Sequence, residues 1–369
     1  MKYALIFLFL PALSCVNHSD QHVQENDIFL EDSEMKSEVK YAQGFELKYG
    51  NGYTQVVTKS IDGNDSFQDT VQLNFKKNTT SATKQINSSL TSVNCQSSTH
   101  LAYLNALGVL NTVSGHCGIQ FISNPTVINE FNKNEVSEIC LNESISVEPL
   151  LTTNPELFFA YPFSKEEVED LKSKGVKSFY IAEYLEKSPL ARLEWIKLFG
   201  VLYQKEKLAS DFFDRAEQEY LAFKKDEINL EQDFIFNLPY GDNWYTPSAN
   251  SLVVKLCEDA GFSYFYQNEK GTENMLHTTE QVWLDGTQAN YWIIIADRPA
   301  EFSLEDLVAE EEVYSTFKSV KNKKVIFCSS ADTDYFFSGV IEPEILLKDL
   351  INITEPIDGY QPKYFRLLN

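Results

Sequence analysis

The chain has 369 residues, of which 43% are hydrophobic and 13% aromatic, so it has the material for a sizeable core and is not mostly disordered. At about 100–200 residues per domain, this length indicates two domains or one large bilobed unit. The formal net charge of −23 disfavours binding to nucleic acid, or to an anionic lipid surface, by charge alone.

The first 14 residues are typical of a secretion signal. Lys2 precedes the apolar run Tyr3–Leu10, and the sequence PALSC follows. The run is too short to cross a bilayer as an ordinary helix. A cysteine after small residues resembles a bacterial lipoprotein signal, so we expect residues 1–14 to be removed and Cys15 to be lipidated. A plain signal peptide is the alternative. Residues 15–39 are polar and acidic and predict a flexible tether.

The remaining cysteines are odd in number, so at least one has no partner within the chain. They show no CxxC motif and no metal-ligand spacing, which favours buried, apolar roles for most of them. Their pairing stays open at this point. They are Cys95, Cys117, Cys140, Cys257 and Cys328.

Residues 40–89 predict a small antiparallel β extension, because three short segments alternate apolar and polar residues between turn signals. From residue 90 to 187, strand and helix patterns alternate, which is typical of βαβ units with a mostly parallel sheet. The expected strands are 90–93, 157–161 and 178–181, and the expected helices are 99–110, 147–152 and 165–174.

One long helix is expected over residues 188–228. Ser188 is a helix-capping residue, Pro189 occupies the first helical position, and apolar residues recur at helical spacing as far as Tyr220. The alternation then restarts over residues 229–369, with strands at 234–238, 264–266, 291–296 and 325–328. The expected helices are 249–260, 279–284, 304–308, 312–320 and 344–353.

The fold class is therefore α/β, with two βα lobes of mostly parallel sheets joined by one long helix, plus the N-terminal β extension. Open α/β sheets bind their ligands beyond the carboxyl ends of the strands. Two such lobes that face each other predict a binding cleft between them.

Several separate segments, in the right order, resemble one family. They include SSTHLAYLNALGVLNTVSGHCG, ISVEPLLTTNPELFFAY, LEKSPLARLEWIKLFG, NLPYGDNWYTPSANSLVVKLCEDAGFSYFY and GVIEPEILLKDLINITEP. Over residues 90–356 the chain resembles the substrate-binding proteins of ABC importers of the ferric-siderophore, haem and cobalamin type. The resemblance implies a rigid interlobe helix, a permease dimer with its ATPase as partner, no catalysis by this chain and no resident cofactor.

A polar segment between a strand and a helix start is the candidate ligand site of the first lobe. Its hydroxyls and free backbone N–H groups suit an acidic or carbonyl-rich ligand, although they also serve simply to cap the helix. Tyr161 ends a strand in the same lobe and joins the candidates. For His100 and His116 a structural role is the commoner one, with a metal or haem-iron contact as the alternative. The segment consists of Ser97, Ser98, Thr99 and His100.

In the second lobe, aromatic and polar residues follow directly after the strand at 234–238. Trp and Tyr on such a loop predict a stacking surface for a planar ligand, such as a macrocycle or an aromatic chelate. A second loop, over residues 332–337, adds a further tyrosine. The candidates are Tyr240, Asp242, Trp244, Tyr245 and Tyr335.

Glu148 and Glu280 belong to a different kind of site. The resemblance implies that one acidic residue on each lobe docks into a basic pocket of the permease. Each glutamate precedes a strand at a matching place in its half of the chain, as a two-fold permease dimer requires. The alternative is that each is a first-turn glutamate favoured by the helix dipole.

The sequence therefore predicts the solute-binding component of an ABC importer, which captures an iron chelate, haem or a cobalamin-like corrinoid. We expect an exported lipoprotein, anchored in the membrane by its lipid, with no nucleic-acid partner. The alternative is a surface or sensory lipoprotein of the same fold that binds a signal molecule or a partner protein and serves no transporter. The sequence has no GxSxG, P-loop or HExxH motif, so no catalytic residue and no metal ligand is nominated.

Overall fold

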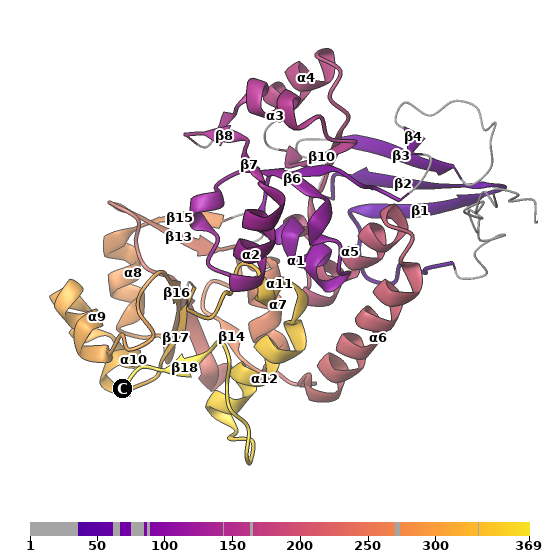
Figure 1. The fold of residues 1–369 in the computed structure, drawn as a ribbon. Helices are drawn as coiled ribbons and strands as arrows, with labels where there is room; N and C mark the ends of the chain where they lie inside the picture. The colour runs from indigo at the N-terminus through magenta and orange to yellow at the C-terminus, as the bar shows by residue number, and fades with distance from the viewer. Residues whose placement is uncertain are drawn as a thin grey trace, which may run out of the picture. The chain divides into compact units, whose positions relative to one another are not determined.

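The computed structural model describes residues 36–61, 67–74, 85–86, 89–142, 144–162, 165–269, 274–330 and 332–369 (Figure 1). The signal sequence, Cys15 and most of the expected tether lie outside the described residues. Within the described ranges, none of the helices combines the length and the apolar character that a membrane crossing requires.

The β extension is a four-stranded sheet in the order β1-β2-β3-β4. The expected antiparallel pairing of its first three strands is confirmed, and β4 pairs parallel with β3. Phe45, Val56 and Leu73 are buried and belong to the same hydrophobic core as the first lobe. The strands are β1 (Phe45–Gly50), β2 (Tyr53–Lys59), β3 (Gln68–Asn74) and β4 (Gln85–Ile86).

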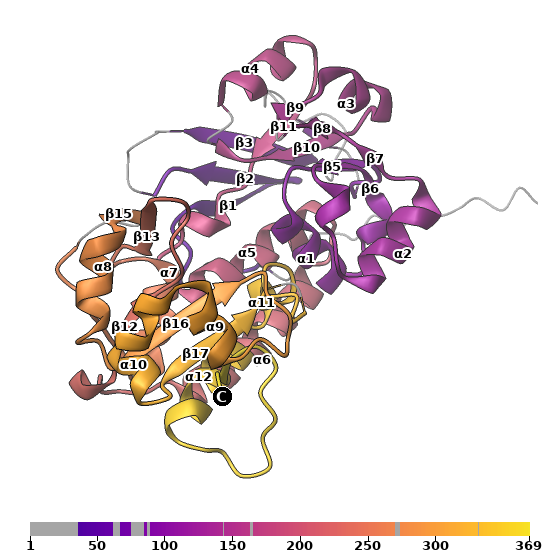
Figure 2. The ribbon, with the colours of Figure 1, turned by 90° about the vertical axis from the view of Figure 1, so that its left-hand side faces the viewer.

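The first lobe contains a five-stranded sheet in the order β11-β10-β5-β6-β7, with every pair parallel. Its strands are β5 (Val93–Cys95), β6 (Val113–His116), β7 (Ser137–Glu138), β10 (Leu157–Ala160) and β11 (Ser178–Tyr180). Its helices, labelled in Figure 2, are α1 (Ser98–Ala106), α2 (Pro125–Asn134), α3 (Val147–Thr153) and α4 (Lys165–Ser173). A short hairpin is formed by β8 (Cys140–Leu141) and β9 (Ser144–Ile145).

The second lobe contains a sheet in the order β14-β12-β16-β17-β18, in which only β18 is antiparallel to its neighbour. Its strands are β12 (Asp233–Phe236), β14 (Ser263–Tyr264), β16 (Tyr291–Ala296), β17 (Val325–Ser329) and β18 (Arg366–Leu367). Its helices are α7 (Leu252–Asp259), α8 (Thr279–Gly286), α9 (Leu304–Glu310), α10 (Lys318–Lys321), α11 (Ser338–Ile341) and α12 (Pro343–Thr354). A separate antiparallel ribbon pairs β13 (Asn243–Pro247) with β15 (Asn274–Thr278).

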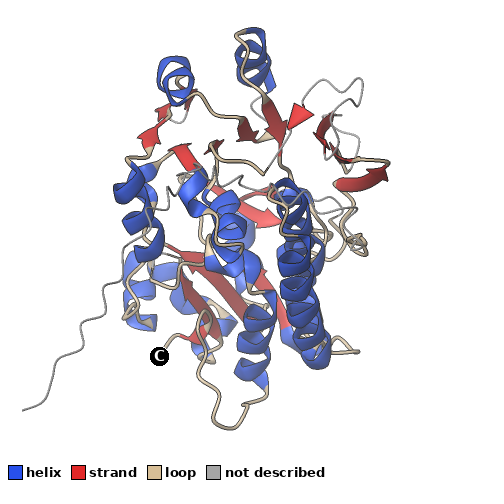
Figure 3. Cartoon of the chain, turned by 45° about the vertical axis from the view of Figure 1, so that its right-hand side comes forward, coloured by secondary structure: helices blue, strands red, loops and turns tan. Residues whose placement is uncertain are grey.

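The two lobes share one strand order. The shared order covers four strands of each sheet, β6-β5-β10-β11 in the first lobe and β14-β12-β16-β17 in the second, with the first and second of the four side by side and then the third and fourth. The first sheet adds β7 beyond β6, and the second adds β18 beyond β17. Helices flank the strands of both sheets (Figure 3). The predicted α/β class with mostly parallel sheets is therefore confirmed, and the second lobe repeats the topology of the first.

The prediction of a single long helix over residues 188–228 is wrong. Two helices, α5 (Pro189–Leu202) and α6 (Glu206–Phe223), pack against each other across a tight turn. Gln204 adopts the left-handed conformation in that turn, with φ of 54°. A Cβ atom on Gly200 would lie only 2.5 Å from the Cβ of Ala209, so glycine permits the close approach of the two helices.

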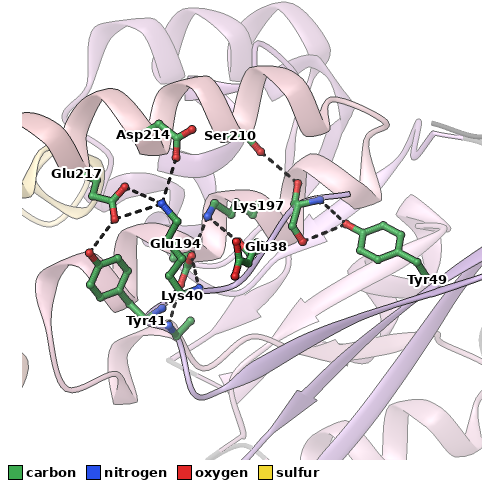
Figure 4. Close-up of polar contacts among 11 residues, drawn as sticks. Glu38, Lys40, Tyr41, Tyr49, Glu194, Lys197, Ser210, Asp214 and Glu217 are labelled. Carbon is green, nitrogen blue, oxygen red and sulfur yellow. Dashed lines mark hydrogen bonds and ion pairs between the residues drawn. The ribbon is translucent and has the colours of Figure 1, made fainter. Parts of the chain in front are cut away.

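Helix α5 is buried on all sides except at Arg192, as expected of a helix that is apolar around its circumference. Its two buried charges, Glu194 and Lys197, form an ion pair of 2.8 Å (Figure 4). Glu194 also accepts hydrogen bonds of 2.7–2.8 Å from the backbone N–H groups of residues 40–42. Lys197 donates to the carbonyl oxygen of Glu38.

Glu186, which precedes α5, binds the residues that follow residues 40–42 in the chain. Its carboxylate accepts the backbone N–H groups of Gln43 and Gly44 and the indole N–H of Trp195. Two buried carboxylates thereby fix residues 37–44, the N-terminal strap, against α5. The strap is the link between the expected tether and β1.

Glu194→Ala should lower the free energy of unfolding by about 3–5 kcal/mol, because it leaves the charge of Lys197 buried and the strap N–H groups unpaired. Urea unfolding followed by circular dichroism measures this change. Asp211→Ala serves as the control, because it breaks an ion pair with Lys207 in which both side chains are more than half exposed. The control should stay within about 0.5 kcal/mol of the wild type. Equal effects of the two variants would contradict the structural role of Glu194.

Candidate functional site

The first-lobe sheet has a switch point between β5 and β10. From β5 the chain crosses to β6 on one side, and from β10 it crosses to β11 on the other. Open α/β sheets bind ligands in the crevice that forms at such a point, outside the carboxyl ends of the strands. Ser97 and Thr99 follow β5, and Tyr161 follows β10, so the structure places these three predicted residues at the switch point.

Hydrogen bonds join these residues into one group. The Tyr161 hydroxyl donates a hydrogen bond to the Ser97 hydroxyl, which in turn lies 3.0 Å from the Thr99 hydroxyl. The Thr99 hydroxyl donates a 2.6 Å hydrogen bond to Oε1 of Glu183. Glu183 begins the 3₁₀ turn after β11 and is fully buried.

Arg192, in the first turn of α5, is the positive charge beside Glu183, with 3.6 Å between the guanidinium and the carboxylate. The pair is incompletely satisfied. Among the described residues, neither Nε of Arg192 nor Oε2 of Glu183 has a hydrogen-bond partner, although both atoms are buried. Burial is the largest single effect and lowers the pKa of Arg192, but the Glu183 carboxylate and three tyrosines together raise that pKa above its usual value.

The second lobe meets this group at the loop between β17 and α11. Tyr335 and Arg192 line one small cavity of about 20 Å³, together with residues of α7, α11 and α12. Nearby, the Asn124 amide donates a 2.7 Å hydrogen bond to Oδ2 of Asp334 and so connects the two lobes. We call Ser97, Thr99, Tyr161, Glu183, Arg192 and Tyr335 the interlobe polar cluster.

The other first-lobe candidates, Ser98 and His100, differ in burial. Ser98 is half-buried at the first position of α1, while Ser97 caps that helix by accepting the N–H of Thr99. His100 is fully buried behind Tyr161, with 5.2 Å between the ring centroids, so its ring offers no exposed surface in this structure, and a ligand contact by His100 stays a prediction. Burial lowers the pKa of His100 to about 3 and that of His116 to about 4. Both rings are therefore neutral at neutral pH.

Trp244 also requires a correction. It lies on β13, fully buried, and packs against Trp292 and Tyr314 of the second-lobe core, while its indole N–H donates to the carbonyl oxygen of Phe236. The expected exposed stacking surface at Trp244 is therefore wrong. Side chains alternate along a strand, and its neighbours on the ribbon point outward. Tyr245 is 41% exposed, Tyr240 is 82% exposed, and Asp242 is exposed in the turn before β13.

The two candidate docking residues occupy equivalent places. Glu148 lies in the first turn of α3, which precedes β10, and Glu280 lies in the first turn of α8, which precedes β16. β10 and β16 are the third strands of the shared strand order. Both glutamates are exposed, and docking itself stays a prediction.

Sequence reasoning missed Glu183, Arg192 and Asn124. The Pro-Leu-Ala-Arg segment at the start of α5 marks a helix start, and nothing in its pattern reveals that Arg192 faces a carboxylate from another segment. The structure also contains a disulfide between Cys117 and Cys140, which resolves the open pairing. Cys95, Cys257 and Cys328 are free and buried, as expected for most of the cysteines.

Trp244→Ala should destabilise the protein by about 3–5 kcal/mol, because it empties a large buried volume. Tyr245→Ala, one residue further on the same strand, should stay within about 0.5 kcal/mol of the wild type, since its side chain faces outward. Thermal or urea unfolding compares the two. A Trp244→Ala variant as stable as the wild type would contradict the burial of this side chain. It would favour the exposed stacking surface that the sequence predicts.

Comparison with known proteins is consistent with this architecture. The periplasmic binding protein family matches residues 104–331, which is more than half of the chain. An uncharacterized lipoprotein of Methanocaldococcus jannaschii is 28% identical over 285 residues, which cover 74% of this chain and 67% of that protein.

Solved structures share the fold at low sequence identity. A periplasmic binding protein of Veillonella parvula has a TM-score of 0.60 at 14% identity, covering 82% of this chain and 98% of its own. The periplasmic haem-binding protein HutB of Vibrio cholerae has a TM-score of 0.57 at 12% identity, covering 72% and 99%. With more than half of its length matched by the family, this chain belongs to the periplasmic binding proteins.

Proposed function

We propose that this protein is the solute-binding component of an ABC importer. It captures an iron chelate, haem or a cobalamin-like corrinoid between its two lobes and delivers it to a permease dimer that is driven by an ATPase. Its family, and the interlobe polar cluster at the switch point of the first-lobe sheet, support this function. Capture and delivery are binding steps, so the proposal includes no catalytic residue and no resident cofactor.

The incompletely satisfied pair of Arg192 and Glu183 is the observation that carries the proposal. An arginine side chain has five N–H donors, and its hydrogen bonds to anionic oxygens are among the strongest in proteins. Leaving a buried donor unpaired costs about 1–3 kcal/mol, which a bound anionic group relieves. Carboxylates of iron chelates, haem propionates and the corrinoid phosphate all supply such oxygens.

Export is supported by the disulfide between Cys117 and Cys140, because disulfides persist mainly in oxidising compartments outside the cytosol. The similar protein of Methanocaldococcus jannaschii is described as a lipoprotein. We propose that lipid on Cys15 holds the protein at the membrane, facing the periplasm or the cell surface, and that residues 15–39 are the tether.

Arg192→Lys should weaken the binding of the cognate solute about tenfold, because lysine keeps the charge and loses the planar set of donors. Haemin and a ferric hydroxamate are suitable first probes, and quenching of tryptophan fluorescence measures their affinity. Arg298→Lys is the matched control, since Arg298 pairs with Glu310 on the surface. The control should bind like the wild type.

Two outcomes would count against this site. Unchanged affinity in Arg192→Lys, for a probe that the wild type binds, would remove Arg192 from the solute contact. A wild-type protein that binds neither these probes nor a corrinoid would contradict the proposed solute class. It would favour a surface or sensory lipoprotein.

Glu148→Lys combined with Glu280→Lys should abolish solute uptake by cells, because both charges that face a basic permease surface are reversed. Solute affinity and folding of the purified variant should stay near the wild type, since exposed substitutions cost within about 0.5 kcal/mol. Glu166→Lys with Glu305→Lys is the control, because these residues are also exposed first-turn glutamates, one in each lobe. Normal uptake by the Glu148 and Glu280 variant would refute the docking role.

A further inference from the structure

Two exposed phenylalanines lie close to the hydrogen bond that joins the lobes. Phe121 of the first lobe is 80% exposed, and Phe336 of the second lobe is 57% exposed. Phe121 lies three residues before Asn124 and Phe336 two residues after Asp334. At about 3.8 Å per residue, their Cα atoms lie within about 11 Å and about 8 Å of the two bridging residues. Single exposed apolar side chains are common on proteins, but these two flank the same contact from opposite lobes.

The loop that carries Phe121 is held rigidly. Its 3₁₀ turn, η2 (Ile119–Phe121), follows Cys117, which is disulfide-bonded to Cys140. The Glu138 carboxylate accepts the backbone N–H groups of Gly118, Ile119 and Cys140 at 2.8–3.0 Å.

Gly118 at the start of this turn has a φ of 76°, where a side chain is strained. A Cβ atom there would also lie 3.0 Å from the ring of Phe121. One disulfide, three hydrogen bonds and one glycine thus fix the position of an aromatic ring that faces solvent.

The opposite loop is fixed as well. Asp334 has a left-handed φ of 57°, and its Oδ2 accepts the hydroxyl of Ser338 in addition to the Asn124 amide. The loop alternates its aromatic side chains, because Tyr335 is half-buried beside Arg192 whereas Phe336 is exposed. Phe337 packs into the first-lobe core and so anchors the second-lobe loop there.

We propose that Phe121 and Phe336 form an aromatic rim that contacts the flat, apolar face of the solute, while the interlobe polar cluster holds its anionic group. This inference rests on the proposed function and selects within its solute classes. It assigns the protein to solutes with an extended aromatic or macrocyclic body, such as haem. The Cys117–Cys140 disulfide pre-organises the rim and so increases affinity by lowering the ordering cost of binding.

The test compares haemin, which is flat and aromatic, with ferric desferrioxamine, which has no aromatic ring. Phe121→Ala and Phe336→Ala should each weaken haemin binding about tenfold and leave ferric desferrioxamine binding, where it occurs, within twofold. Cys117→Ser with Cys140→Ser should weaken haemin binding several-fold at a temperature where circular dichroism shows a folded protein. Leu230→Ala, which removes a 74% exposed side chain elsewhere on the second lobe, is the control and should not change haemin binding.

The outcomes separate this inference from the proposed function. Haemin binding that is unchanged in both phenylalanine variants would overturn the aromatic rim alone, as would a wild type that binds ferric desferrioxamine but not haemin. Equal losses of affinity for haemin and ferric desferrioxamine in the phenylalanine variants would overturn the preference for flat solutes. A wild type that binds neither probe and no corrinoid would overturn the proposed function together with the rim.

Discussion

The buried ion pair of Glu194 and Lys197 on α5 is the interaction on which the position of the strap and of the β extension depends. Two charges away from water are tolerable only when each is paired and hydrogen-bonded. Here the strap supplies the further hydrogen-bond partners of the two charges. Its backbone N–H groups donate to Glu194, and the carbonyl oxygen of Glu38 accepts from Lys197. The strap can therefore occupy only one place, and it carries the β extension into the first-lobe core.

The position of α5 also determines how the lobes are connected. The helix contacts α1 and β1 on the first-lobe side and α7 and α12 on the second-lobe side. Helix α6 then starts in the first core, where Phe213 is buried, and ends in the second, where Tyr220 donates to Asp259. Two packed helices that share both cores oppose large hinge motions. The proposed solute would then enter past the loops at the carboxyl ends of the strands, where Asn124 and Asp334 join the lobes.

Much of this architecture follows from local patterns in the sequence. Periodicity placed most strands and helices of both lobes within a few residues of their observed positions, and the restart after residue 229 revealed the repeat. The break between α5 and α6 was not predictable, because Gln204 in a left-handed conformation has no distinctive local signal. The close contact of Gly200 with Ala209 that accompanies the break is tertiary.

The candidate site was predictable only in part, because local patterns do not show tertiary contacts. Strand ends indicated Ser97, Thr99 and Tyr161, because any parallel sheet presents its carboxyl ends together. Trp244 was misassigned because a tryptophan after a strand reads as a loop residue, whereas here the chain turns and forms β13 with that side chain inward. Arg192 and Glu183 become partners only when α5 packs beside the turn after β11. The two residues are only nine positions apart, but their contact depends on how the turn and the helix pack together, which local patterns do not show.

Mass spectrometry of the small molecule retained by protein purified from its native host tests the central claim most directly. We expect one solute per chain, with a flat macrocyclic or aromatic body, a bound metal and at least one anionic oxygen. Native mass measurement of the same sample should show a one-to-one complex that dissociates in denaturant. A protein that retains no small molecule and instead copurifies with a stoichiometric protein partner would contradict the assignment as a solute-binding protein.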